Sequence, residues 1–262
     1  MRWLVFALLA LATGADAQNV SALQDADIVL LGEVHDNPGH HAAQAQAIAA
    51  LGPTALVFEM LTPDQAKTVV PSLMADEAAL SAALDWENSG WPDFALYFPL
   101  FQAAPDAAIL GAGLPRDAAR QALEGGVAKH FGSDAGHFGL ADPLPPEEQA
   151  AREAEQAAAH CDALPDSLLP GMVDLQRLRD ALLARAALEA LDAHGGPVVV
   201  ITGNGHARRD GGVPQVLEHV RPGVRVVSVG QDEGGRIDGV YDVVWEGPLV
   251  KRRDPCEAFR KN

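Results

Sequence analysis

Residues 27–35, DIVLLGEVH, decide the fold, because a run that is apolar at almost every position passes directly into a glycine, a glutamate and a histidine. Further short runs of the same apolar character lie at residues 55–59, 107–110, 197–202 and 224–229. Apolar runs separated by Ala-rich helical stretches are typical of strands in a parallel sheet that is covered on both faces. The sequence therefore predicts an α/β fold with a mainly parallel central sheet and helices on both faces, and residues 241–245 alternate more, as an edge strand does.

A helical insertion is expected after the second strand, over residues 61–105. Aromatic residues gather there in a chain that is otherwise poor in them: Trp86, Trp91, Phe94, Tyr97, Phe98 and Phe101. Such a cluster is either a small satellite core that holds the insertion together or the apolar wall of a ligand pocket.

Two long helices are expected later in the chain, over residues 145–160 and 168–194. On the second, Gln176, Arg179 and Asp180 share one face at i, i+3 and i+4 spacing. This face either reaches over the strand ends or forms a polar cluster on the surface.

The first 17 residues, MRWLVFALLALATGADA, have the pattern of a cleavable signal peptide. Arg2 provides the positive start, an apolar stretch follows, and Ala15 and Ala17 form the small-x-small pattern that signal peptidase cleaves after. The apolar stretch is shorter than the roughly 20 residues that a membrane-spanning helix needs. We therefore expect residues 1–17 to be removed and residues 18–262 to form a single α/β domain, periplasmic or secreted, with no stable membrane span after processing.

The net charge indicates which binding partners are excluded, and the two cysteines predict a disulfide. The formal net charge of −17 argues against binding to nucleic acid or to anionic membranes. In an oxidising compartment the two cysteines, Cys161 and Cys256, are expected to form one disulfide, and two free buried thiols are the alternative.

Four residues at predicted strand ends carry the chemistry. Glu33 and His35 follow the first strand and point to the same side, because side chains alternate in an extended chain. Glu59 ends the second strand, and His206 follows the fourth in the segment Gly203-Asn204-Gly205-His206. The carboxyl ends of parallel strands meet at one edge of a sheet, where open α/β folds bind their ligands.

These four side chains are consistent with three kinds of site. Two histidines and two carboxylates form a ligand set for a divalent transition metal with an open position for water. The same residues can work without metal as an acid and base pair. Alternatively, they cap strand ends and bond to the loop backbone.

The chain resembles the ChaN-like, haem-binding uptake branch of the Tiki superfamily, which includes TraB-like proteins and is related to the erythromycin esterases. The matching segments, which cover nearly the whole mature chain, are residues 31–38 (LGEVHDNP) with His40, His41 and Gln44, then residues 57–60 (VFEM), 86–87 (WE), 90–92 (GWP), 111–116 (GAGLPR), 176–180 (QRLRD), 203–208 (GNGHAR) and 212–214 (GVP). Two Gly-x-x-His motifs, in this order and with a glutamate between them, make the resemblance specific.

The resemblance implies an exported protein that binds haem or iron and acts in haem or iron uptake. Arg116 and Arg208 adjoin the matching motifs and are expected to pair with haem propionates, and Trp86, Trp91, Tyr97 and Asn204 are the other expected ligand-binding residues. The family also associates haem binding with a tyrosine on the iron and with pairing of subunits. Only Tyr97 and Tyr241 can provide that tyrosine here, and a homodimer is the corresponding expectation.

The alternative that the resemblance leaves open is a metal-dependent hydrolase, peptidase-like or esterase-like, which uses the two Gly-x-x-His motifs. Glu33 or Glu59 would act as the base on a metal-bound water, and Asn204 and Arg208 would stabilise the developing negative charge. Whether the protein is an enzyme at all stays open at this stage, because the same site could hold a ligand or a metal without catalysis.

Overall fold

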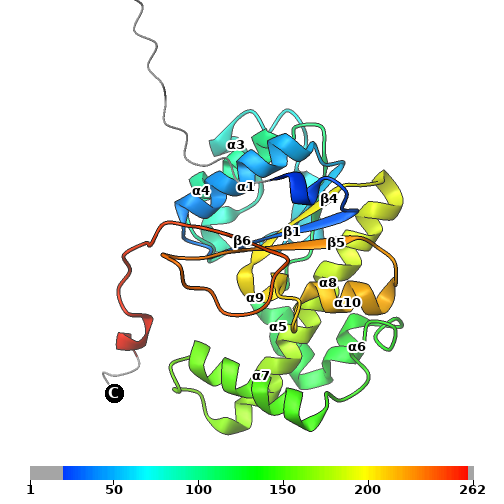
Figure 1. Ribbon diagram of the computed structural model, residues 1–262, viewed down its shortest axis with the longest axis vertical. Coiled ribbons are helices and arrows are strands. Elements are labelled where there is room, and N and C mark those ends of the chain that lie inside the picture. The colour runs from blue at the N-terminus through cyan, green and yellow to red at the C-terminus, as the bar shows by residue number, and fades with distance from the viewer. Residues whose placement is uncertain (1–19, 259–262) are drawn as a thin grey trace, which may run out of the picture.

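The computed structural model of the chain describes residues 20–258, which form a layered α/β structure around one sheet (Figure 1). The strands are β1 (Ile28–Glu33), β2 (Ala55–Phe58), β3 (Ala108–Gly111), β4 (Val198–Gly203), β5 (Val226–Gln231) and β6 (Val243–Trp245). They form a six-stranded sheet in the order β3-β2-β4-β1-β5-β6, and every neighbouring pair is parallel. The predicted α/β class is therefore confirmed. The predicted signal peptide lies outside the described residues.

The helices connect these strands in the alternating manner of α/β proteins. They are α1 (Pro38–Leu51), α2 (Pro63–Thr68), α3 (Glu77–Ala83), α4 (Phe94–Ala103), α5 (Arg116–Gly125), α6 (Val127–Phe131), α7 (Pro146–Ala159), α8 (Leu169–His194), α9 (Asn204–Ala207) and α10 (Val213–Val220). Short 3₁₀ helices cover Val20–Leu23, Trp86–Asn88, Asp166–Leu168 and Pro255–Ala258. The predicted insertion at residues 61–105 corresponds to α2, α3, one 3₁₀ turn and α4, all between β2 and β3.

Two apolar layers cover the sheet, one on each face. Successive residues of β1 point to opposite faces, so that Val29 and Leu31 join one cluster and Ile28 and Leu30 join the other. The first cluster includes side chains of α1, α3 and α4, and the second includes side chains of α5, α6, α8 and α10, which lie on opposite sides of the sheet in Figure 1. This double cover explains why the central strands are apolar at nearly every position.

Local sequence signals fix the helix that follows β1. The Asn37 side chain accepts a hydrogen bond from Gly39 N at 3.0 Å and so caps α1, and Pro38 occupies the first helical position. The helix ends at Gly52, whose φ of 56° is left-handed and suits glycine. With these ends fixed, His40 and His41 lie on the buried side of α1, next to the end of β1.

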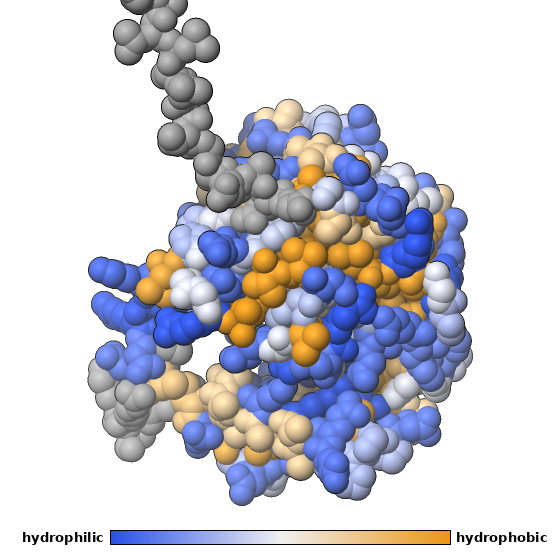
Figure 2. Space-filling model, viewed as in Figure 1, coloured by the Kyte–Doolittle hydropathy of each residue, from blue (hydrophilic) through white to orange (hydrophobic). Residues whose placement is uncertain are grey.

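The surface is mostly polar on the face in Figure 2, apart from a hydrophobic band across its middle, where the sheet reaches the surface. Val244 of the edge strand β6 is one of the exposed large apolar side chains, with 48% exposure. Helix α7 is an outer element, since none of its residues is buried. Within residues 20–258, none of the helices combines the length and the apolar character needed to cross a membrane.

Candidate functional site

Glu33 and His35 lie at the carboxyl end of β1 and form the first half of the site. Glu33 is the last residue of the strand and is 2% exposed. His35 Nδ1 lies 2.8 Å from Glu33 Oε1, so the two side chains point to the same side, as their spacing predicts. Burial alone would lower the pKa of His35, but the hydrogen bond to Glu33 and the charge of Glu59 outweigh it and raise the pKa above 6.5.

Two buried rings, those of Tyr97 and His41, face Glu33 from the other side. Tyr97 from α4 donates its hydroxyl to Glu33 Oε1 at 3.0 Å. His41 Nδ1 lies 3.5 Å from Glu33 Oε2, while His41 Nε2 donates to the carbonyl oxygen of His35 at 2.8 Å. Because one ring nitrogen already donates to a carbonyl, the other has a proton to offer Glu33 only when the His41 ring is doubly protonated. The Tyr97 hydroxyl therefore holds Glu33 on this side, while Glu33 Oε2 and His41 Nδ1 are buried without a hydrogen-bond partner among the described residues.

Glu59 follows β2 and provides the carboxylate in the middle of the site. Its Oε2 accepts hydrogen bonds from Thr202 Oγ1 at 2.6 Å and from Gly203 N at 2.8 Å. Burial would raise the pKa of this carboxyl group, yet the charges of His206 and His35, together with these hydrogen bonds, lower it below 4.5. The partners thereby offset the cost of burying a carboxylate at a strand end.

His206 lies between two carboxylates. Its Nδ1 is 2.6 Å from Asp180 Oδ1, and its Nε2 is 3.5 Å from Glu59 Oε1. Burial would lower the pKa of His206, but the charges of Glu59 and Asp180 raise it above 6.5. Burial raises the pKa of Asp180 despite the neighbouring histidine. The contact joins His206 to a buried carboxylate, and the site is closed to solvent on the Asp180 side.

The two halves meet at Gly203, the end of β4. A Cβ at this position would lie 3.0 Å from His35 Nε2 and 3.8 Å from Glu59 Oε2, so the absence of a side chain lets the end of β4 pack closely against the His35 ring. The four predicted residues are thus brought to one edge of the sheet as two pairs, Glu33 with His35 and Glu59 with His206. Within residues 20–258, no group of three or more His, Cys, Asp or Glu side chains is placed to hold a metal ion.

A cavity of about 750 Å³ opens beside the second pair. It is lined by Glu59 and His206, by Trp91 from the insertion, and by two arginines, Arg116 and Arg179. The Trp91 ring also contacts the His35 ring edge-on, with centroids 4.9 Å apart, and a third of the His35 side chain is exposed. The size is typical of small-molecule sites.

The two arginines of the cavity have no carboxylate partner, unlike most other arginines of the described chain. Within residues 20–258, neither Arg116 nor Arg179 lies within ion-pair distance of a carboxylate, whereas Arg152, Arg208 and Arg252 each have at least one acidic partner. The lining of this cavity also includes two carboxylates, Glu59 and Asp117, so the positive charge is local to the two guanidinium groups. That part of the cavity is suited to an anionic group.

Two residues predicted to bind ligand are engaged elsewhere. The Asn204 side chain pairs with the backbone of Gln231, accepting from its N at 3.0 Å and donating to its O at 2.8 Å, so it extends the sheet. Arg208 donates to Glu155 and to both oxygens of Asp210, each at 2.9 Å, and lines a second cavity, of about 790 Å³, beside α7. Neither residue lines the cavity beside His206.

The aromatic insertion divides between core and cavity. Trp86 and Tyr97 are buried in the apolar cluster, and Trp86 Nε1 donates to Pro92 O at 2.8 Å. Trp91 alone of the six predicted aromatics lines the cavity. Both interpretations of the insertion therefore hold in part: five rings pack in the core, and one forms a wall of the pocket.

Sequence reasoning left two contributors to the site undecided and missed a third. Asp180 and Arg179 lie on the face of α8 that was predicted to lie either over the strand ends or on the surface, and the structure places them over the strand ends. Thr202, the residue before Gly203 in β4, is fully buried and gives its hydroxyl to Glu59. The helical spacing along α8 was the only sequence signal for Arg179 and Asp180. Thr202 gave no signal, because it lies at the end of an apolar strand.

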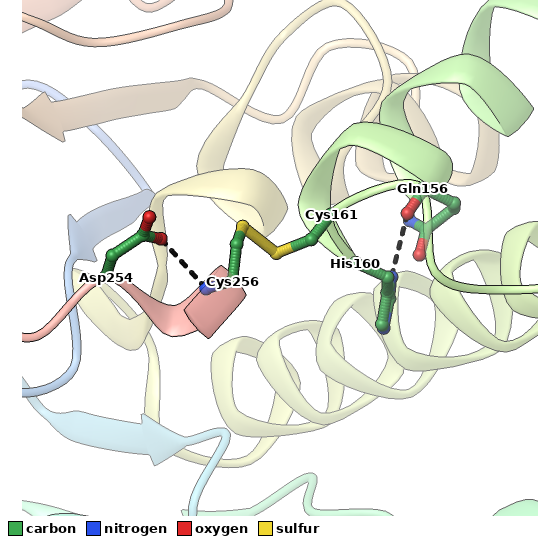
Figure 3. Close-up of a disulfide and its surroundings, with 5 residues drawn as sticks. All are labelled: Gln156, His160, Cys161, Asp254 and Cys256. Carbon is green, nitrogen blue, oxygen red and sulfur yellow. Dashed lines mark hydrogen bonds between the residues drawn. A yellow bond between two sulfur atoms is a disulfide. The ribbon is translucent and has the colours of Figure 1, made fainter. Parts of the chain in front are cut away.

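Cys161 and Cys256, the cysteines for which a bridge was predicted, form a disulfide with an S–S distance of 2.02 Å (Figure 3). The bond links the turn after α7 to the C-terminal 3₁₀ helix. The segment leading to it passes the β1–α1 turn, where Arg252 forms ion pairs with Asp36 and Glu233, both at 2.6 Å. The C-terminal tail, residues 246–258, is thus attached at two places, beside His35 through the ion pairs of Arg252 and beside α7 through the disulfide.

The fold and the site together define a class: a parallel α/β domain whose carboxyl-edge site is built from two Gly-x-x-His segments and an intervening glutamate. A model of the family described as "Haem-binding uptake, Tiki superfamily, ChaN" matches residues 19–217, and the chain belongs to this family.

Two solved structures are similar in fold. One is described as "Cofacial heme binding to ChaN of Campylobacter jejuni"; it is 21% identical, with 84% of this chain and 86% of that chain covered and a TM-score of 0.62. The other is the type III effector HopBA1, at 17% identity, 88% and 92% coverage and a TM-score of 0.50. No curated protein gives a significant match. At these identities, the likeness to the two structures shows the fold alone.

Proposed function

We propose that this protein binds haem at the carboxyl edge of its sheet and acts in haem or iron uptake. The observation that carries the proposal is the cavity beside His206, where two arginines without a carboxylate partner lie near an indole ring. Membership of a haem-binding family, and the cofacial haem binding described for ChaN of Campylobacter jejuni, support haem as the ligand.

The cavity has the chemistry that a haem needs around its carboxylates. Propionates are recognised by guanidinium groups, which donate paired hydrogen bonds to carboxylate oxygens. Arg116 begins α5 and Arg179 lies on α8 next to Asp180, so the two charges come from different elements and can hold two separate carboxylates. Trp91 offers a flat apolar face to a porphyrin ring.

Export is part of the proposal. The N-terminal 17 residues have the signal-peptide pattern, and a disulfide between Cys161 and Cys256 is stable in an oxidising compartment such as the periplasm. A secreted or periplasmic protein with a net charge of −17 would carry its ligand without adhering to anionic lipid.

A haem titration of the mature protein tests the proposal. Residues 18–262 are titrated with ferric haem, and the change in the Soret band is followed to saturation. Arg116→Ala and Arg179→Ala should each weaken binding about tenfold, because each removes one charge-assisted contact. Arg120→Ala is the matched control, since Arg120 lies on the same helix but pairs with Asp117.

Haem dimethyl ester sharpens the test. If the arginines hold the propionates, the ester should bind the wild type less tightly than haem does, and the Arg116→Ala substitution should add no further loss. A wild-type protein that gives no saturable Soret change would refute haem binding. The stoichiometry, with sedimentation before and after saturation, would also test the expected pairing of subunits.

A second candidate function, hydrolysis, is favoured by one observation: each histidine of the site has a carboxylate on its Nδ1, Glu33 for His35 and Asp180 for His206. This arrangement orients the ring and leaves Nε2 to act as a base or a ligand. Glu59 lies next to the His206 Nε2 and would be the second acid–base group. Turnover of ester and peptide substrates by the wild type, with and without added zinc or manganese, and its loss in Glu59→Gln would support this candidate.

A further inference from the structure

Helix α7 forms the outer wall of the second cavity, the one of about 790 Å³. Arg152 and Glu155 of this helix line the cavity, and Gln176 of α8 and Gly205 of α9 line it from the other side. Gln176 Nε2 lies 3.1 Å from His206 Nδ1, and Gly205 directly precedes His206 in the chain. The second cavity therefore lies on the Nδ1 side of His206, and α7 covers it.

Noncovalent contacts hold α7 only weakly. The helix lies against α8, but none of its residues is buried, so little apolar surface fixes it. Arg152 donates to Gly211 O and to Gln215 Oε1, each at 3.1 Å. Arg208 forms an ion pair with Glu155, whose side chain is half exposed, and exposed ion pairs contribute little to stability. These contacts alone would let α7 move away from α8 at a low cost.

The disulfide is the strong attachment of α7. Cys161 lies in the turn directly after this helix, and Cys256 lies in the C-terminal tail (Figure 3). The tail is itself fixed beside the start of α1, where Asn37 Nδ2 donates to Pro248 O at 2.9 Å and Arg252 forms its two ion pairs. The bond therefore attaches α7 covalently to a segment that is held against the carboxyl edge of the sheet.

The turn that carries Cys161 has an unfavourable backbone conformation. Cys161 has a φ of 60° and Asp162 a φ of 52°, both in the left-handed region that residues other than glycine rarely adopt. Such a conformation persists only where the surrounding structure holds it. Here backbone hydrogen bonds to Ala158 O and Ala157 O and the disulfide hold it. Both cysteines are partly exposed, so a small dithiol can reach the bond, and breaking it removes one constraint on this turn.

We infer that the Cys161–Cys256 disulfide is a redox switch that fixes α7, the helix that covers the second cavity and the Nδ1 side of His206. A dithiol reductant opens the switch: one of its thiolates attacks a sulfur of the bond, and its second thiol resolves the mixed disulfide. Two electrons and two protons pass to the cysteines, and the reductant becomes a disulfide. The released α7 then uncovers the second cavity. The inference goes beyond haem binding and does not depend on it.

Hydrogen–deuterium exchange of the oxidised and the reduced protein tests the inference. Residues 18–262 are compared before and after treatment with dithiothreitol under native conditions, and thiol counting confirms that the bond is broken. The backbone amides of α7 should exchange about tenfold faster after reduction, because the helix opens locally. The C2 proton of the His206 imidazole should also exchange faster, because its cover has moved. The amides of β1 and β4 should keep their protection, since the sheet stays folded.

Control variants keep the outcomes distinct. A Cys161→Ser, Cys256→Ser variant should exchange as the reduced wild type does and should not respond to dithiothreitol. Glu155→Gln is the matched control, because it weakens a noncovalent contact of α7 and keeps the disulfide; its α7 should stay protected until the bond is reduced.

Three outcomes would overturn the inference. The first is equal exchange of α7 and of the His206 C2 proton in both redox states, or a change in only one of them. The second is a bond that dithiothreitol reduces only after the sheet unfolds. The third is a loss of protection that extends to β1 and β4, because the bond would then stabilise the whole fold and not one helix. Absence of haem binding in the wild type would bear on the proposed function and not on this switch.

Discussion

Asp180 Oδ1 lies 2.6 Å from His206 Nδ1, which connects the middle of α8 to the turn after β4 across 26 residues of sequence. The contact fixes which ring nitrogen faces Glu59 and the cavity. It also places a second negative charge on a buried imidazole and contributes to its raised pKa.

Replacing Asp180 with asparagine should lower the pKa of His206, because the amide keeps the shape and an acceptor but loses the charge. It should also destabilise the fold by about 1–3 kcal/mol, the cost of weakening a buried hydrogen bond to a charged group. Histidine NMR titration and urea denaturation would measure the two effects. Asp174→Asn, a change on the same helix at a half-exposed position, is the control; an unchanged His206 pKa in Asp180→Asn would contradict the prediction.

The two glycines of Gly203-Asn204-Gly205 should respond differently to alanine. At Gly203 a Cβ would press on the His35 ring at 3.0 Å, whereas at Gly205 the nearest atom is Gln176 Nε2 at 3.9 Å, an ordinary contact. Gly203→Ala should therefore cost about 1–3 kcal/mol through overpacking. Gly205→Ala should be close to neutral in stability. Thermal denaturation of both variants provides the comparison, and equal losses of stability would argue against a special role for Gly203.

The fold could be predicted because its signals are local. Strands such as β1 and β4 are apolar at successive positions, and this pattern requires apolar layers on both faces. The pairing of Glu33 with His35 also follows from the alternation of side chains along one strand. The side chains at the carboxyl ends of the strands can therefore be predicted to lie close together, because a parallel sheet brings those ends to one edge.

The rest of the site depends on contacts that the sequence does not encode locally. Asp180 reaches His206 only because α8 packs across the sheet. The sequence pattern of a helix indicates which of its faces is buried but not which strand that face packs against. Asn204 was predicted to bind ligand from its glycine neighbours, yet its amide completes the backbone pairing of Gln231. Arg208 adjoins the motif in sequence, but its partners Glu155 and Asp210 direct it toward α7.

Stability should fall at low pH in part through Asp210. The hydrogen bonds from Arg208 lower the pKa of this carboxyl group from 3.8 to about 2. Because the folded pKa lies below the unfolded one, the stabilisation is fully present above about pH 4 and is lost as the pH falls through about 2. The side chain is 37% exposed, so solvent screening limits the effect to about 1 kcal/mol or less. The difference in unfolding free energy between the wild type and Asp210→Asn should shrink from pH 5 to pH 2; a constant difference would refute this assignment.

The disulfide should stabilise the protein through the long loop that it closes. Cys161 and Cys256 are 95 residues apart, and in the unfolded chain such a crosslink removes much conformational freedom, typically worth about 2–4 kcal/mol. The tail carries few buried groups, however, so in a Cys161→Ser, Cys256→Ser variant it can detach from α7 while the sheet stays folded. We therefore expect a loss of about 2 kcal/mol, near the lower end of that range, in urea denaturation monitored by circular dichroism, together with faster proteolysis within residues 246–258. Arg252→Ala, which keeps the disulfide but removes the ion pairs with Asp36 and Glu233, should leave the proteolysis rate nearer that of the wild type. If the serine variant unfolds at the same urea concentration and is cut no faster, the bridge does not hold the tail.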